Sequence, residues 1–286
     1  MEKIKTSVVL EGGGMRGAFT AGALSWLIDH NIEPDNAYGI SSGAVHLCSY
    51  LKKSKKDLEE FSTIWINSDG VVGIKPFLKC GRIVDYYYMF EDLLPKQLSF
   101  TLDGVRDCKT DGYIGIYELE QGKTVYHSLR EVDMKELQAA CTLPLIGKLV
   151  EYHGRHMMDG GITDMIPIEQ AIKDGCNRNL VISTKPATYV RKPAMGIVVE
   201  SMRINYPKWP SVADDYKVRH LNFAKQINEI KEEEEKGQAV YIYPTKESNV
   251  TRLGGSREEL QELYDLGYAD MEARKEEIFK LFGIDA

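Results

Sequence analysis

The sequence predicts an α/β protein, because it begins with two strand-loop-helix units and carries a further buried strand later on. Residues 6–10 and 37–40 are short apolar runs with the length of buried strands. Each run leads through a glycine-containing loop into a segment with helical apolar spacing, at residues 18–28 and 44–51. Residues 180–184 form another such apolar run. At 286 residues the chain can form one large α/β domain or two small ones.

The first loop, residues 11–17 (EGGGMRG), lies where backbone N–H groups can converge on an anion. A Walker phosphate loop is excluded, because the Gly-Lys-Ser/Thr ending is absent. A dinucleotide fingerprint fits the spacing of Gly12, Gly14 and Gly17, but it requires an acidic residue at the end of the second strand, where this chain carries Gly39. An oxyanion hole for the serine of the next loop is the favoured interpretation. A tight glycine turn without chemistry is the alternative.

The second loop, residues 39–43 (GISSG), places Ser41 between two glycines where a strand meets a helix. This pattern suits a sharp turn that lifts the serine hydroxyl off the backbone, and Gly39 and Gly43 leave room for the turn. The helix N-terminus also favours negative charge on the serine oxygen. Because a solvated serine in a glycine-rich turn fits the same pattern, a nucleophilic role requires a base nearby.

The remainder of the chain alternates helical and extended patterns. Residues 52–60 are highly charged and predict a solvated helix end and loop, whereas residues 58–66 have helical spacing. Residues 68–100 fit either a small helical insert on the core or a cap over the serine with an apolar inner side. Residues 185–210 predict a second mobile segment near the site. The other predicted strands are residues 113–119, 123–129, 149–152, 156–158 and 239–244, and the other helices are residues 134–141, 168–173, 211–236 and a last helix from Ser256.

Composition narrows the classes of function. The net charge of −7 argues against a nucleic-acid partner and against adhesion to anionic membranes by charge, although it allows contact through an apolar rim. The five cysteines are odd in number and lack C-x-x-C spacing, so neither a disulfide framework nor a thiolate zinc site is expected. The apolar run near the N-terminus, residues 7–10, is too short for a signal-peptide core, and no stretch reaches the length of a membrane span. We therefore expect a cytoplasmic protein, which would bind a membrane only at its surface.

Three motifs occur in a characteristic order: residues 12–17, residues 39–43 and the triplet 159–161 (DGG). Together they resemble the motifs of the patatin-like phospholipases, and the region from residue 209 to residue 270 looks like a bacterial branch of that family. The resemblance implies a three-layer α/β/α fold with a mostly parallel central sheet and helical cap insertions.

The same resemblance implies one domain over residues 1–286. Residues 68–110 would be a cap insertion in it, and residues 186–286 would be a C-terminal extension of helices and strands.

Roles follow from the resemblance residue by residue. Ser41 would be the nucleophile and Asp159 the base of a Ser–Asp dyad, which forms an acyl-serine intermediate without a metal or other cofactor. The backbone N–H groups that bind the oxyanion would belong to Gly12, Gly13, Gly14 and Met15. The residues that support these motifs are Arg16, Gly17, Gly39, Gly43, Gly160 and Gly161.

Other residues leave alternatives open. Arg16 can steady the loop, attract a phosphate head group or form a structural salt bridge. His46 is expected to face away from Ser41, whereas His153 or His156 could approach the site as a base, and their H-x-x-H spacing is a weak indication of metal. Asp164 is expected to cap a loop and not to act as a second base.

The resemblance implies a lipid acyl hydrolase of the phospholipase A or lysophospholipase type, with a lipid or acyl ester as substrate and transient contact with a membrane surface. One alternative is a general carboxylesterase or thioesterase on soluble acyl esters. The other is a regulatory lipid-binding protein with incidental activity.

Overall fold

A computed structural model describes residues 4–284 of the chain, so residues 1–3 and 285–286 of the expected domain lie outside the described part. The strands are β1 (Thr6–Leu10), β2 (Asn36–Ile40), β3 (Asp111–Glu118), β4 (Lys123–Ser128), β5 (Val150–Tyr152), β6 (Arg155–Asp159), β7 (Arg178–Ile182) and β8 (Ala239–Ile242). In the described residues they form one sheet with the order β5-β6-β3-β2-β1-β7-β8, and β4 pairs with β3. The strands from β3 to β8 in this order are parallel, and the pairs made by β4, β5 and β6 are antiparallel.

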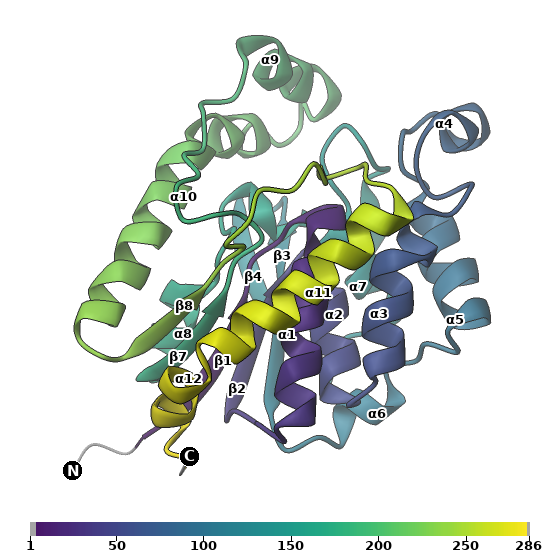
Figure 1. Ribbon diagram of the computed structural model, residues 1–286. Coiled ribbons are helices and arrows are strands. Elements are labelled where there is room, and N and C mark those ends of the chain that lie inside the picture. The colour runs from purple at the N-terminus through teal and green to yellow at the C-terminus, as the bar shows by residue number, and fades with distance from the viewer. Residues whose placement is uncertain (1–3, 285–286) are drawn as a thin grey trace.

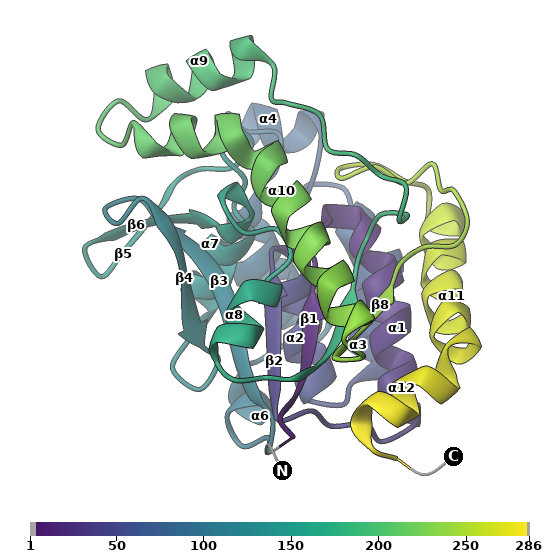
Figure 2. The same cartoon turned by 90° about the vertical axis from the view of Figure 1, so that its left-hand side faces the viewer.

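Helices cover both faces of this sheet (Figure 1). One face carries α1 (Gly17–Asp29), α2 (Ser42–Leu51), α3 (Lys55–Thr63) and α11 (Arg257–Ala273), and the other carries α8 (Ile168–Lys173) and α10 (Ser211–Glu235). Figure 2 shows α8 and α10 in front of the strands. The predicted three-layer α/β/α fold with a mostly parallel central sheet is therefore confirmed.

The central strand β1 illustrates why the sheet is buried on both sides. Val8 and Leu10 belong to the apolar cluster under α1, whereas Val9 belongs to the cluster under α10. Successive side chains of a strand point to opposite faces, so an unbroken apolar run requires a helical layer on each face. All three side chains are fully buried.

The remaining helices stand around the sheet or beyond its ends. The region of residues 68–110 contains α4 (Ile74–Cys80), the π-helical turn η3 (Tyr88–Leu93), α5 (Leu94–Gln97) and α6 (Asp103–Arg106), and later come α7 (Met134–Cys141), α9 (Gly196–Asn205) and α12 (Lys275–Phe282). Both α4 and α9 lie beyond the carboxyl ends of the parallel strands, the end at which open α/β sheets bind ligands (Figure 1). Among the described helices, none is long and apolar enough to cross a bilayer.

The C-terminal part of the chain packs directly on the first helix. A Cβ atom on Gly22 of α1 would lie 1.8 Å from the carbonyl oxygen of Tyr264, and one on Gly267 of α11 would lie 2.0 Å from that of Phe19. Only glycine at these two positions lets the backbones of α1 and α11 approach so closely.

Two predictions about local structure are wrong. The charged residues 52–60 are not mainly a loop, because Ser54 caps α3 and accepts a hydrogen bond from the Asp57 backbone, and Leu58 packs into the core. The helix that begins after Ser256 is not the last one, because α12 follows it with Ile278 buried.

Candidate active site

Ser41 occupies a strained turn between β2 and α2. Its backbone has φ 56° and ψ −125°, an uncommon conformation for a residue with a side chain. A Cβ atom on Gly39 would lie 2.6 Å from the Gly43 carbonyl oxygen, and one on Gly43 would lie 3.0 Å from the Leu10 carbonyl oxygen. Both glycines are therefore required by close backbone approach, and the predicted sharp turn is present.

The register of β3 brings Asp159 next to this turn. Gly115 of β3 pairs with Ile40 at the end of β2, and the next residue, Ile116, pairs with Asp159 at the end of β6. Because β4 occupies the other edge of β3, β2 and β6 follow one another along the same edge. The carboxylate thus lies beside Ser41, although the two residues are far apart in sequence.

The Asp159 side chain is 2% exposed and makes hydrogen bonds with the Ser41 side chain and the Gly161 backbone. The Gly161 N–H donates to its Oδ1 over 2.7 Å. Burial raises the pKa of Asp159, while these two hydrogen bonds and the charges of Arg219 and Arg252 act in the opposite direction. The net direction is upward, which makes the carboxylate a stronger base than an ordinary aspartate.

The glycine loop offers fewer free N–H groups than its sequence suggests. The N–H of Gly12 donates to the Met165 carbonyl over 3.2 Å, and that of Met15 donates to the Arg252 carbonyl over 3.0 Å. The N–H of Gly13 donates to Ser42 Oγ over 3.0 Å. Among the described residues, the N–H of Gly14 has no acceptor. The candidate oxyanion donors therefore narrow to Gly14 and, if Ser42 releases it, Gly13.

Gly14 also needs to be glycine. Its φ is +60°, and a Cβ atom there would lie 2.3 Å from the Arg252 carbonyl oxygen. Three residues later, Gly17 begins α1, and a Cβ atom on Gly17 would lie 2.6 Å from Nε2 of His46. The supporting glycines Gly160 and Gly161 are buried beside Asp159.

A buried ion pair lies beneath the loop, and nothing local in the sequence predicted it. Glu11 is fully buried and accepts hydrogen bonds from Lys185 Nζ, from the Ser183 hydroxyl and, over 2.7 Å, from the Thr184 backbone. Burial, together with nearby arginines, lowers the pKa of Lys185, and the Glu11 carboxylate stabilises its ammonium form. Since Glu11 follows β1 and Lys185 follows β7, the pair ties together the ends of two neighbouring parallel strands.

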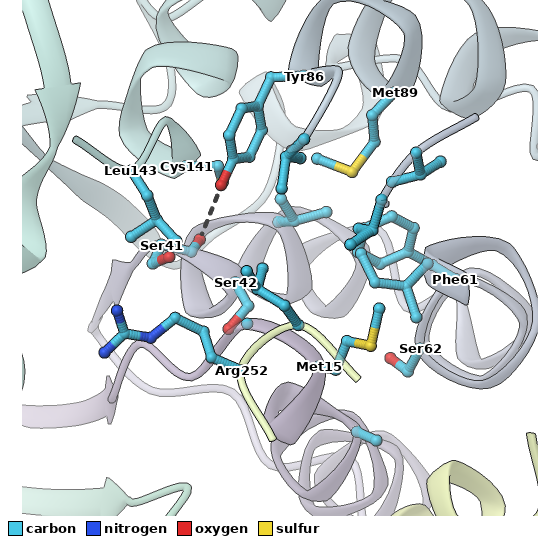
Figure 3. Close-up of a pocket in the computed structure, with 18 of the residues that line it drawn as sticks. Met15, Ser41, Ser42, Phe61, Ser62, Tyr86, Met89, Cys141, Leu143 and Arg252 are labelled. Atoms are coloured by element: carbon cyan, nitrogen blue, oxygen red, sulfur yellow. Dashed lines mark hydrogen bonds between the residues drawn. The ribbon is translucent and has the colours of Figure 1, made fainter. Parts of the chain in front are cut away.

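One side of Ser41 opens into a pocket with almost wholly apolar walls, which we call the apolar pocket. Figure 3 shows Phe61, Met89 and Met15 around it, and Tyr86 reaching toward the Ser41 end. Its other apolar lining residues are Ala18, Val45, Ile66, Val71, Val72, Val84, Cys141, Leu143 and Leu253. Five of these lining residues, Val71, Val72, Val84, Tyr86 and Met89, belong to residues 68–110. That this region acts as a cap over the serine stays a prediction.

The other side of Ser41 and Asp159 is strongly basic. We call it the cationic pocket, and its charged lining residues besides Asp159 are Arg16, Lys185, Arg191, Arg219 and Arg252. Of these, the sequence had singled out only Arg16, which forms no ion pair with the described residues and has a buried Nε without a partner. A structural salt bridge is therefore ruled out for Arg16 in this part of the chain.

The histidines lie in different parts of the structure. His46 lines the apolar pocket, where its ring packs against Phe61, and burial lowers its pKa to about 4. His156 lies elsewhere, where its Nδ1 is 2.6 Å from Glu120 Oε1. His153 is exposed in the turn between β5 and β6. Neither His153 nor His156 lines a pocket with Ser41.

Asp164 is partly buried, lines neither pocket of Ser41, and accepts a hydrogen bond from Gln226 Nε2 over 2.9 Å and another from the Tyr126 hydroxyl. Burial raises the pKa of Asp164 to about 7. Within residues 4–284, no group of three or more His, Cys, Asp or Glu side chains is arranged to hold a metal ion.

Comparison with known proteins gives matches over most of the chain. The model of the patatin-like phospholipase family matches residues 8–172, and that of a domain of unknown function, DUF6363, matches residues 209–283. The uncharacterized protein YjjU of Escherichia coli K12 is 24% identical over 277 residues, which cover 92% of this chain and 75% of YjjU. The crystal structure of VipD from Legionella pneumophila aligns with a TM-score of 0.48 and 13% identity, over 98% of this chain and 67% of VipD.

We predict that Glu11→Ala strongly destabilises the fold, because it leaves Lys185 buried without its carboxylate partner. Breaking a buried pair in this way costs roughly 3–5 kcal/mol. Urea unfolding measures the loss, and Glu232→Ala on the exposed side of α10 is the matched control. Equal midpoints for the two variants would contradict the role assigned to the ion pair.

Proposed function

The chain belongs to the patatin-like phospholipase family, and from this membership we propose that it hydrolyses acyl esters of lipids through an acyl-serine intermediate on Ser41, with Asp159 as the base. The observation that carries the proposal is the contact between these two side chains, beside a glycine loop with a free backbone N–H and between an apolar and a cationic pocket.

In the first half of the proposed reaction, Ser41 Oγ attacks the ester carbonyl carbon while its proton passes to Asp159. The carbonyl oxygen becomes an oxyanion, which the N–H groups of Gly14 and Gly13 stabilise. The carbon–oxygen bond to the alcohol then breaks, and the alcohol leaves with the proton from Asp159. The acyl group remains on Ser41 as an ester.

In the second half, a water molecule gives a proton to Asp159 and attacks the acyl carbon. The bond to Ser41 Oγ breaks, the fatty acid leaves and the proton returns to Ser41. Asp159 suits both steps because burial raises its pKa, which makes proton acceptance less unfavourable than for a solvated aspartate.

The apolar pocket favours a lipid acyl chain over a short soluble ester. Most of its lining side chains are apolar, among them Phe61 and Met89. The polar groups that line it belong to Ser41, Ser42, His46, Ser62, Tyr86 and Arg252. Each CH₂ group buried there contributes about 0.8 kcal/mol. Turnover of p-nitrophenyl esters should therefore increase with the length of the acyl chain. A preference for short chains would instead support a general carboxylesterase or thioesterase, and an absence of turnover would support a regulatory lipid-binding protein.

We predict that Ser41→Ala and Asp159→Asn each lower kcat by roughly four orders of magnitude or more, because each removes one member of a unit that acts together. Initial rates on a long-chain p-nitrophenyl ester measure this, with circular dichroism as the check on folding. His156→Ala is the control, since that ring contacts Glu120 and lies outside both pockets. If the His156→Ala variant is inactive and the Asp159→Asn variant is active, the Ser–Asp dyad is wrong and the mechanism depends on a histidine.

We further propose that α4 and α9 touch the lipid surface. Both helices lie at the end of the molecule that carries the site (Figure 1), and both expose apolar side chains, of which Leu78 on α4 is 79% exposed and Ile197 on α9 is 73% exposed. Other exposed apolar residues on these helices are Ile74, Phe77 and Ile204, and the segment before α9 adds Val190 and Met195. Such a gathering at one end of a protein is typical of an interaction surface.

We predict that the double variant Leu78→Asp, Ile197→Asp loses roughly ten-fold or more in binding to phospholipid vesicles, because two apolar anchors no longer enter the bilayer. Vesicle co-sedimentation measures the loss. Leu221→Asp is the control, since Leu221 is similarly exposed but lies on α10. Unchanged co-sedimentation of the double variant would exclude these helices as the contact.

A further inference from the structure

The cationic pocket concentrates positive charge that its surroundings do not balance. Its four arginines come from separate segments: Arg16 lies in the glycine loop, Arg191 follows β7, Arg219 lies on α10 and Arg252 precedes α11. In the described part of the chain none of the four forms an ion pair. Arginines elsewhere do, as Arg155 does with two glutamates.

Acidic groups cannot neutralise this pocket from within. Asp159 is the one acidic residue that lines it among the described residues, and it faces Ser41. Glu11, just below, is engaged by Lys185. Burial, followed by repulsion from Arg191 and Arg252, lowers the pKa of Arg219 to about 10, which reflects the crowding of like charges.

Three of the four guanidinium groups are nevertheless held in place by the fold. Nε of Arg219 donates to the Gly161 carbonyl, the Arg252 side chain is hydrogen-bonded to Tyr216, and the Arg191 guanidinium lies 4.9 Å from the centre of the Phe223 ring. Such contacts fix the orientation of the charges before any ligand arrives, which lowers the entropy lost on binding.

Two donors in the pocket still lack acceptors. Nε of Arg16 and Nε of Arg191 are buried, and neither has a hydrogen-bond partner in the described residues. Buried donors are almost always paired in native proteins, so unpaired ones require an explanation. A ligand that brings several acceptor oxygens would satisfy both.

The position of the pocket relates this ligand to the reaction. Figure 3 shows Ser41 with the Arg252 guanidinium on one side and the side chains of Phe61 and Met89 on the other. An acyl chain in the apolar pocket therefore leaves the alcohol of the ester on the cationic side. The group that the four arginines bind would then be part of the alcohol that leaves when the ester is cleaved.

We infer that Arg16, Arg191, Arg219 and Arg252 bind a phosphate group on the alcohol portion of the substrate, and that the enzyme prefers esters whose phosphate is a terminal monoester. A phosphate monoester carries close to two negative charges and three acceptor oxygens, which match the forked donors of arginine. A phosphocholine group adds an ammonium, for which the pocket has no free carboxylate. This inference rests on the proposed hydrolase function.

The test compares three substrates with the same oleoyl chain: a lysophosphatidic acid, a lysophosphatidylcholine and a monoacylglycerol. We expect kcat/KM to be highest for the lysophosphatidic acid. In Arg191→Gln and Arg252→Gln, the ratio of kcat/KM for lysophosphatidic acid to that for monoacylglycerol should fall about 10- to 100-fold, the effect of losing one charge-assisted hydrogen bond. Arg130→Gln is the control, because Arg130 is exposed, pairs with Asp111 and lines neither pocket.

Calorimetry on Ser41→Ala separates this inference from the proposed function. Lysophosphatidic acid should bind to this variant more tightly than monoacylglycerol, and the additional Arg191→Gln change should remove the difference, whether or not the wild type hydrolyses any ester. Equal affinity for the two lipids, or wild-type selectivity in both arginine variants, would overturn the inference. Binding of inorganic phosphate without any preference for the phosphorylated lipid would also overturn it, because the pocket would then serve a free anion.

Discussion

The register of β3 is the constraint on which the site depends. This strand pairs with β2 as far as Gly115 and with β6 from Ile116, so the ends of two strands with opposite directions meet at one point of the sheet. Ser41 leaves one of these ends and Asp159 forms the other. A shift of one residue would turn the Asp159 side chain to the opposite face of the sheet, because strand side chains alternate between faces.

The position of Ser41 between two unlike pockets connects this geometry with chemistry. The apolar pocket can bury a chain, the cationic pocket can hold an anion, and the ester bond of a molecule with both parts would lie at the serine. The same low-dielectric surroundings raise the pKa of Asp159 and strengthen its interactions with nearby charges. In the proposed reaction, specificity and reactivity would therefore share one physical origin, the burial of charged groups beside an apolar wall.

What the sequence could predict was local. The sharp turn at Ser41 and the glycine loop depend on close backbone contacts that only glycine allows, so both are recognisable in the sequence as glycine motifs. Asp159 was then identified from the family resemblance. Most of the cationic pocket left no such pattern, because Arg219 is one charged residue in a long polar helix and only the fold brings it to Gly161. The free donors of the loop were overestimated for the same reason, since Met165 and Arg252, which engage Gly12 and Met15, are distant in sequence.

The central claim is that Asp159 takes the proton from Ser41 without a histidine, and the pH dependence of labelling by a fluorophosphonate tests it most directly. We expect the adduct to map to Ser41. We expect the labelling rate to fall with decreasing pH as Asp159 becomes protonated, and this fall should begin at a higher pH than for an ordinary aspartate because the pKa of Asp159 is raised. Asp159→Asn should show almost no labelling at any pH. An adduct on Ser42, or labelling of Asp159→Asn at the wild-type rate, would contradict a Ser41–Asp159 dyad.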